Sequence, residues 1–154
     1  MRRQEFEQLV AEALDALPRQ FRKYMRNIAV VVETAPSQAL LEEMDLWPDH
    51  TLLGLYQGVP LPDRGHSYGN ILPDHITIFQ QPIEASKVRE ELVSRGFGEV
   101  FVQGAEEQKL VIKTKNLTAE EKLALQAALR EKFGDYEEIS FLNIGPTLGS
   151  ELLR

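Results

Sequence analysis

The chain has 154 residues, 43% of them hydrophobic, with a formal net charge of −7 and no cysteine. This length suits one compact domain of ordinary size or two very small ones. The lack of cysteine excludes disulfides, thiolate zinc sites and iron–sulfur clusters. The acidic net charge opposes binding to a phosphate backbone, so we expect no nucleic-acid partner.

The first helix is predicted over residues 5–17, where apolar residues recur at helical spacing before Pro18. A short basic helix follows, and it ends near Met25. Its cations share one helical face, which is more typical of a solvated surface than of a nucleic-acid or lipid site; they are Arg19, Arg22, Lys23 and Arg26.

The run NIAVVVE, residues 27–33, predicts a strand covered on both faces, because its apolar residues are continuous rather than alternating. A short helix with Pro36 in its first turn is expected next, then a strand over residues 51–58. The loop VPLPDRGHSYGNILPD, residues 59–74, is the least regular part of the chain. Irregular loops often carry function or mark a boundary.

The second half predicts a regular succession of elements, and the order β-α-β-β-α-β is that of a ferredoxin-like sandwich, with both helices on one face of a four-stranded sheet. A capping box of Thr118 and Glu121 begins the second helix, and Gly134 ends it. The fold class expected for the whole chain is α+β. The expected elements are strand 76–79, helix 84–96, strands 98–103 and 108–114, helix 118–134 and strand 136–144.

Residues 1–79 resemble a family of bacterial metallopeptidase-like proteins with a minimal zincin fold. The resemblance is carried by FEQLVAEALDALP, NIAVVVE, TLLGLYQGVPL and RGHSYGNILPDHITIF. In that family the strand corresponding to Ile76–Phe79 is followed, after a helical connection, by a zinc helix bearing H-E-x-x-H. The resemblance therefore implies an N-terminal α/β segment of truncated minimal-zincin type.

The zinc helix itself is missing from the sequence. Two histidines four residues apart share one helical face and can bind one metal ion, while the glutamate between them activates water. The histidines of this chain are His50, His66 and His75, and no pair has that spacing. We expect loop or surface roles for them, no metal or cofactor, and no enzyme activity, although the sequence leaves open whether any of them binds metal.

Residues 76–154 resemble the extracytoplasmic head domain of the protein-export subunits SecF and SecD. The resemblance is carried by PIEASKVREELVSRGFGEVFVQ, KLVIKT, LTAEEKLALQAALREKFG and ISFLNIGPTLGSELLR. The family motif G-P-x-x-G-x-E-L is matched by Gly145, Pro146, Gly149 and Glu151, for which a turn at a strand end is the simpler interpretation. The membrane helices of that family are not matched.

The two resemblances meet at ITIFQQPI, residues 76–83, which suits either family as an apolar strand entering a helix. We therefore divide the chain into residues 1–75 and 76–154 and favour an engineered or recombined chimera. The sequence leaves open whether the halves share one core. If they do, elements of the second half are expected to bury the apolar faces of residues 28–32 and 51–56.

Three functions remain open at this level. The favoured hypothesis is a folded chimera or remnant without an intact active site. One alternative is an accessory or interaction module of the protein-export machinery, with a protein partner. Another is a diverged zinc metallopeptidase that uses its loop histidines, with Glu33, Glu42 and Glu43 as available carboxylates. No membrane span or secretory signal is recognised, so the chain as encoded is expected to be cytoplasmic.

Overall fold

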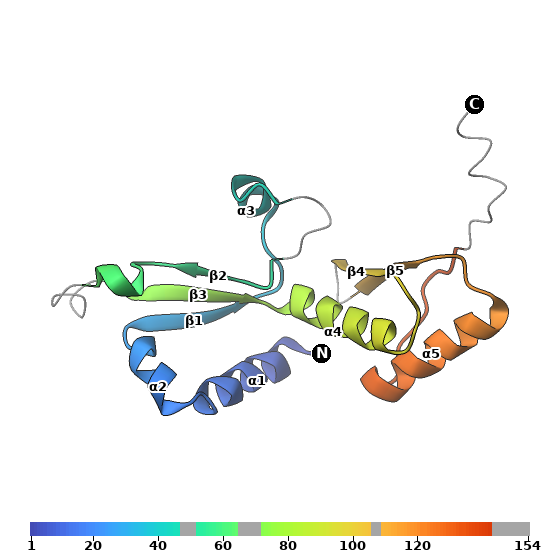
Figure 1. The fold of residues 1–154 in the computed structure, drawn as a ribbon, viewed down its shortest axis with the longest axis horizontal. Coiled ribbons are helices and arrows are strands. Elements are labelled where there is room, and N and C mark those ends of the chain that lie inside the picture. Colours follow the sequence, from blue (N-terminus) through green and yellow to red (C-terminus); the bar gives the residue numbers. More distant parts are fainter. Residues whose placement is uncertain (47–51, 65–71, 106–108, 143–154) are drawn as a thin grey trace. The chain divides into compact units, whose positions relative to one another are not determined.

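The computed structural model describes residues 1–46, 52–64, 72–105 and 109–142 (Figure 1). It confirms the α+β class and divides the chain into two compact units. The described residues of unit 1 lie within Met1–Glu84, and those of unit 2 lie within Ala85–Ala105 and residues 109–142. In these ranges no helix is both long enough and apolar enough to cross a membrane.

Unit 1 is built on a three-stranded sheet with strand order β1-β3-β2. Strand β3 is central: it pairs in parallel with β1, Val30 opposite Ile76, and antiparallel with β2, Tyr56 opposite Ile76. The elements are α1 (Arg3–Asp15), α2 (Arg19–Arg22), the 3₁₀ turn η1 (Lys23–Met25), β1 (Ile28–Glu33), α3 (Gln38–Glu43), β2 (Gly54–Gln57), η2 (Leu61–Asp63) and β3 (Asp74–Phe79).

Helix α1 covers one face of β1 (Figure 1). Successive side chains of a strand point to opposite faces, so Val30 and Val32 share a face. Together with Val10 and Leu14 of α1, these two valines line an apolar recess. Val32 is only 7% exposed, and its carbonyl oxygen accepts a hydrogen bond from Arg3 Nη2 at 2.5 Å.

The opposite face of β1 is not fully covered. Val31, which points away from Val32, is 41% exposed, so the expectation of a strand buried on both faces is wrong. Leu53 and Tyr56 keep 45% and 40% of their surface exposed, and burial of residues 28–32 and 51–56 by elements of the second half stays a prediction. The valine run therefore reflects β propensity as much as burial.

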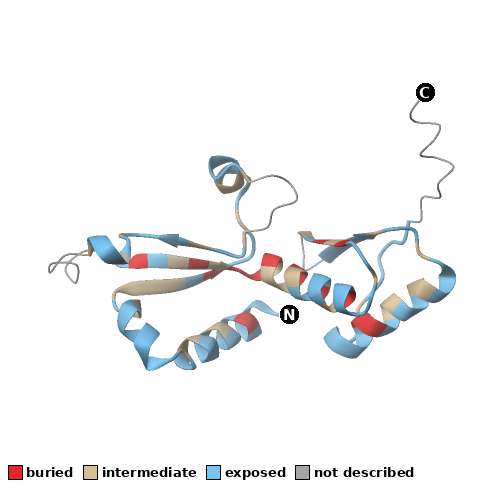
Figure 2. Ribbon diagram, viewed as in Figure 1, coloured by how far each residue is buried: buried red, intermediate tan, exposed pale blue. Residues whose placement is uncertain are grey.

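Unit 2 has an apolar core between two helices and a two-stranded sheet (Figure 2). Its elements are α4 (Gln80–Ser94), of which residues from Ala85 onward belong to this unit, β4 (Val100–Ala105), β5 (Lys109–Thr114) and α5 (Ala119–Phe133). Strands β4 and β5 pair antiparallel. The buried core residues are Ala85, Val88, Leu92, Val100, Val102 and Leu129.

The capping box of α5 is confirmed. The Glu121 amide donates to Thr118 Oγ1 at 3.2 Å, and the Thr118 amide donates to Glu121 Oε2 at 2.8 Å. Gly134 ends the helix with φ of 83°, a conformation that a residue with a Cβ adopts only with strain. Both signals are local, which is why the sequence suffices to find them.

The expected ferredoxin-like sheet is not formed within the described residues, and this part of the prediction needs correction. Strand β3, which was expected to open that sheet, has both of its edges taken by β1 and β2. Tyr136–Leu142, expected as the last strand, has no strand assignment. It instead contacts α5, where Glu138 accepts hydrogen bonds from Lys122 and Gln126.

The boundary between the units falls inside α4, between Glu84 and Ala85. Helix α4 begins at Gln80, directly after the last residue of β3, with Pro82 in its first turn, where proline is tolerated. The sequence division at 75/76 instead falls inside β3. The chain thus passes from unit 1 to unit 2 within a helix rather than through a loop.

Candidate functional site

Of the residues singled out in the sequence, only some can be placed. His75 lies in β3 with an exposed side chain, between Ala29 of β1 and Gln57 of β2. His50 and His66 lie outside the described residues. The same holds for the export motif residues Gly145, Pro146, Gly149 and Glu151.

The carboxylates considered as metal ligands, Glu33, Glu42 and Glu43, are all exposed. In the described ranges, no three side chains of His, Cys, Asp or Glu lie close enough together to hold a metal ion. The described candidate ligands therefore do not form a set of three around a common point.

The most highly organised polar site surrounds Asp74, the first residue of β3. We call it the Asp74 cluster and define it by Tyr56, Gly58, Val59, Arg64 and Asp74. Asp74 is 4% exposed, and the Arg64 side chain is 11% exposed. A buried carboxylate is costly unless charge and hydrogen bonds compensate it.

Asp74 receives that compensation from three neighbours. Arg64 Nη2 lies 3.0 Å from Asp74 Oδ2, and the Tyr56 hydroxyl lies 2.5 Å from the same oxygen. The Val59 amide donates to Asp74 Oδ1 at 3.2 Å. Both carboxylate oxygens are therefore engaged by donors from β2 and from the loop after it.

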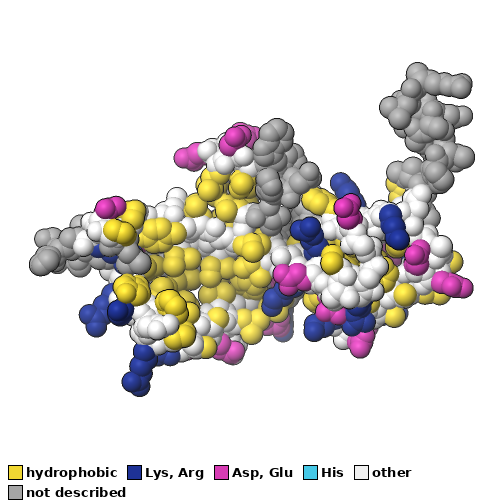
Figure 3. All heavy atoms as spheres, viewed as in Figure 1, with side chains coloured by type: hydrophobic (Ala, Val, Ile, Leu, Met, Phe, Trp, Pro, Cys, Tyr) yellow, Lys and Arg dark blue, Asp and Glu magenta, His cyan; other side chains and the backbone are white. Residues whose placement is uncertain are grey.

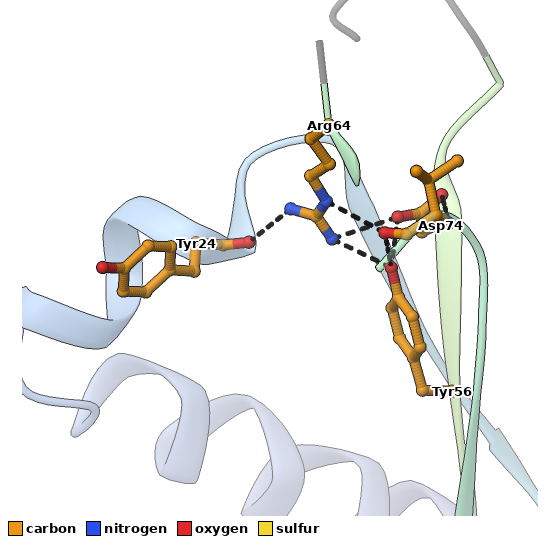
Figure 4. Close-up of polar contacts among 5 residues, drawn as sticks. Tyr24, Tyr56, Arg64 and Asp74 are labelled. Carbon is orange, nitrogen blue, oxygen red and sulfur yellow. Dashed lines mark hydrogen bonds and ion pairs between the residues drawn. The ribbon is translucent and has the colours of Figure 1, made fainter. Parts of the chain in front are cut away.

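Arg64 extends the cluster to a third segment of unit 1 (Figure 4). Its Nη1 donates to the Tyr24 carbonyl oxygen at 3.2 Å, and its Nε donates to the Val59 carbonyl oxygen at 3.2 Å. The guanidinium group also approaches the Tyr56 hydroxyl at 2.9 Å. A planar group with five N–H donors can join several acceptors in this way, which lysine cannot do.

Gly58 makes room for the carboxylate. A Cβ atom at residue 58 would lie 2.1 Å from Asp74 Cγ, far inside any van der Waals contact. Glycine is therefore required here by the close approach of the Asp74 side chain rather than by backbone conformation alone.

The resolved pKa shifts belong to exposed helix caps and ion pairs. Hydrogen bonds lower the pKa of three carboxyl groups. Glu5 accepts them from Arg2, and Glu121 accepts them from Thr118. Glu138 accepts them from Lys122 and Gln126. Hydrogen bonds to Glu131 and Glu91 raise the pKa of Arg95. These shifts report surface structure and do not identify an acid or base for catalysis.

The Asp74 cluster ties the start of β3 to the end of β2, to the loop after β2 and to the carbonyl of Tyr24. Its groups are satisfied by one another, which is the arrangement of a structural clamp. The sequence motifs GLYQGVPL and LPDHITIF contain several of these residues, but the sequence alone predicts no role for them. The available signal is an aspartate at the head of an apolar strand, with Tyr56 in a neighbouring strand and Gly58 directly after that strand.

These same residues lie in the segment that matches a known family. The sequence matches the zincin-like metallopeptidase family over residues 25–103, slightly more than half of the chain. The chain belongs to this family. The zincin-like match includes every residue of the Asp74 cluster, and it continues past Phe79 through α4 into β4. The zincin-like resemblance therefore extends beyond the point at which the sequence interpretation ended it.

The chain is also similar to the protein translocase subunit SecF of Thermobaculum terrenum. The two are 30% identical over 86 residues, which cover 48% of this chain and 27% of the SecF protein. The chain thus corresponds to about a quarter of the length of this relative. Both resemblances expected from the sequence are confirmed.

Proposed function

We propose that this chain is a non-catalytic member of the zincin-like metallopeptidase family, a folded remnant or chimera that has the Asp74 cluster but lacks the family's catalytic helix. The proposal rests mainly on which elements follow β3 in the chain. Helix α4 contains no histidine, and the chain then enters the β4–β5 hairpin. In the family that the first half resembles, a zinc helix with H-E-x-x-H comes after the corresponding strand and its helical connection.

The packing of α4 supports this proposal. Ala85, Val88 and Leu92 form one apolar face of α4, and they pack with Val100 and Val102 of β4. A helix that presents zinc ligands needs two imidazoles and a glutamate on its inward face. The inward face of α4 instead carries apolar side chains that form part of the core of unit 2.

The chemistry of the Asp74 cluster also favours a structural role. Asp74 is bound by an arginine, a tyrosine and an amide, so its oxygens are already engaged by protein donors. A carboxylate that binds zinc or activates a water molecule must keep a lone pair directed at the metal or the water. We therefore assign this cluster the role of fixing β2 and the loop after it against β3 in unit 1.

The direct test measures zinc content and peptide hydrolysis on the purified full chain. After dialysis against buffer that contains a trace of zinc, we expect less than one zinc ion per chain. We also expect no hydrolysis of casein or of a mixed peptide library above the rate in buffer alone. A His75→Ala variant serves as the matched control and should retain the same zinc content. One zinc ion per chain, together with hydrolysis that a chelator abolishes, would overturn the proposal.

The similarity to SecF favours a second candidate, binding to the protein-export machinery through unit 2. The supporting observation is 30% identity to an export subunit over about half of this chain. The test is binding of the full chain to purified translocase in detergent. A Leu123→Glu variant, which changes an exposed residue of α5, should weaken that binding if α5 forms the contact. Failure of the wild-type chain to bind would remove this candidate.

A further inference from the structure

The segment Arg19–Arg26 has a charge opposite to that of the whole chain. We call it the basic turn; it comprises α2, η1 and Arg26. It contains four cations and no acid, and the sequence holds no acid anywhere from Ala16 to Val32, although the net charge of the chain is −7. Figure 3 shows the dark-blue basic side chains gathered at this corner of unit 1 beside yellow hydrophobic ones.

Two large aromatic side chains of the basic turn are also exposed. Phe21 is 51% exposed and Tyr24 is 43% exposed. The ammonium group of Lys23 lies 4.6 Å from the centroid of the Tyr24 ring, so a cation and an aromatic face are presented together. A solvated helix surface, which the sequence alone favoured, would not be expected to expose two aromatic rings among its cations.

Hydrogen bonds hold the backbone of the basic turn in place. Arg22 is used inward: its Nε donates to the Leu17 carbonyl oxygen at 2.8 Å, and its Nη2 binds the carbonyl oxygen of Asp15. At the other end, Arg64 of the Asp74 cluster binds the Tyr24 carbonyl oxygen, and the Asp74 amide donates to the Asn27 carbonyl oxygen at 3.0 Å.

Figure 4 shows the Tyr24 ring directed away from the Asp74 cluster while its carbonyl oxygen faces Arg64. The backbone is thus anchored, and the exposed side chains of Arg19, Phe21, Lys23, Tyr24 and Arg26 are displayed by a preorganised segment. Binding through such a segment costs little ordering of the backbone.

We propose that the basic turn docks unit 1 on an anionic lipid bilayer surface. Cations attract the lipid headgroups, and aromatic rings are favoured at the boundary between headgroups and acyl chains. The acidic residues elsewhere in the chain oppose this attraction weakly, because charges more than about 10 Å apart in solvent are screened at moderate salt. An extended polyanion such as nucleic acid would meet more of the acidic surface, and is therefore disfavoured.

The test is co-sedimentation of the full chain with lipid vesicles. We expect binding to phosphatidylcholine vesicles that contain about one-third phosphatidylserine, little binding to pure phosphatidylcholine, and a marked loss when salt is raised to about 0.5 M. The double variant Lys23→Glu/Arg26→Glu should weaken binding by more than about 25-fold, since loss of each basic residue near the surface costs about fivefold and each new glutamate adds repulsion.

Two further double variants test the aromatic side chains and the net charge of the chain separately. Phe21→Ser/Tyr24→Ser should weaken binding by about tenfold while leaving its salt dependence unchanged. Lys87→Glu/Arg89→Glu makes the same change in net charge at exposed residues of α4 and should bind as the wild type does. Circular dichroism on each variant checks that the fold is retained.

Equal binding to both kinds of vesicle, or equal losses in the basic-turn and α4 variants, would overturn the proposal. It would also be overturned if a single-stranded oligonucleotide or a polyglutamate peptide bound the basic turn more tightly than the anionic vesicles did. The expected result is therefore specific for lipid as well as for these residues.

Discussion

Unit 1 buries an aspartate and two neutral polar side chains, whereas the buried residues described in unit 2 are apolar. In unit 1 the buried polar residues are Asp74, Thr77 and Gln80, and the first of these is bound by Arg64. In unit 2 the ion pairs lie at the surface, as between Arg95 and Glu131. A buried ion pair contributes specific geometry more than net stability, while apolar burial contributes stability with less directional control.

This contrast fits the different packing of the two units. The sheet of unit 1 has an uncovered side at Val31, so it buries less apolar surface and relies on a directional clamp to fix β2 and the loop after it against β3. Unit 2 has two helices on one small sheet, and Leu92 is fully buried among them. The two units should therefore respond differently to removal of a charge and removal of a methyl group.

The largest effect is expected for Asp74→Ala. It removes the carboxylate that pairs with the buried Arg64 guanidinium group, which costs about 4 kcal/mol of unfolding free energy. Hydrogen exchange should show loss of protection in β1 and β3 and retained protection in β4 and β5. Asp63→Ala, an exposed aspartate of the same loop, is the matched control. Equal loss in both units would refute independent stabilisation.

Leu92→Ala is expected to cost about 3 kcal/mol, because it leaves a cavity in the core of unit 2. The amides of β4 and β5 should lose protection while those of β1 and β3 keep theirs. Leu123→Ala removes the same atoms from a side chain that is 66% exposed, and should change stability little. Urea denaturation gives the overall loss, and hydrogen exchange assigns it to a unit.

Gly58→Ala should destabilise unit 1 by about 2 kcal/mol, since the new methyl group would overlap the Asp74 side chain. The same substitution should cost clearly less in an Asp74→Gly background, where the overlapping atoms are absent. A double-mutant cycle measures this coupling. Additive costs would show that backbone conformation, and not the carboxylate, requires glycine at this position.

Thr118→Ala is expected to cost about 1 kcal/mol in unit 2, because it removes the side-chain cap of α5. Ser37→Ala removes the corresponding cap of α3, where Ser37 Oγ accepts from the Leu40 amide, and should affect unit 1 only. Thermal unfolding with site-resolved exchange compares the two. A loss in the opposite unit for either variant would contradict the division.

The smallest effect is expected from acidification. Hydrogen bonds from Lys122 and Gln126 hold the pKa of Glu138 below its ordinary value of 4.5. Because the pKa of Glu138 is lower in the folded state, the contact of Glu138 with α5 is fully stabilised when the pH is above 4.5. This stabilisation is lost as the pH falls through the folded-state pKa. Nuclear magnetic resonance should therefore show Tyr136–Leu142 leaving α5 below about pH 4.5. Glu138→Gln should abolish this pH dependence, and Glu137→Gln should preserve it.

Local signals in the sequence were sufficient for most elements. The helical spacing before Pro18 predicted α1, and the Thr118 capping box predicted the start of α5, because both depend on residues close together in the chain. Sheet partners depend on distant residues. The alternation of Ile76–Phe79 predicted a strand correctly, but it did not show that both edges of that strand would be taken within unit 1.

The Asp74 cluster was beyond sequence reasoning for a related reason. Its ion pair joins Arg64 to Asp74, ten residues apart in the chain, and the burial of both depends on tertiary contacts with Tyr24 and Tyr56. Charged residues are usually exposed, so a single sequence gives no reason to place this pair inside. The residues stand within the family motifs, but only the distances between their side chains show that they form an ion pair and hydrogen bonds.

The position of the unit boundary inside α4 has a practical consequence for dissecting the protein. A fragment that ends at His75 would lose most of β3, the strand that pairs with both β1 and β2. A fragment that ends at Glu84 would keep the sheet but stop one helical turn into α4. Proteases that cut exposed loops would find none at this boundary, so truncation will have to divide a helix.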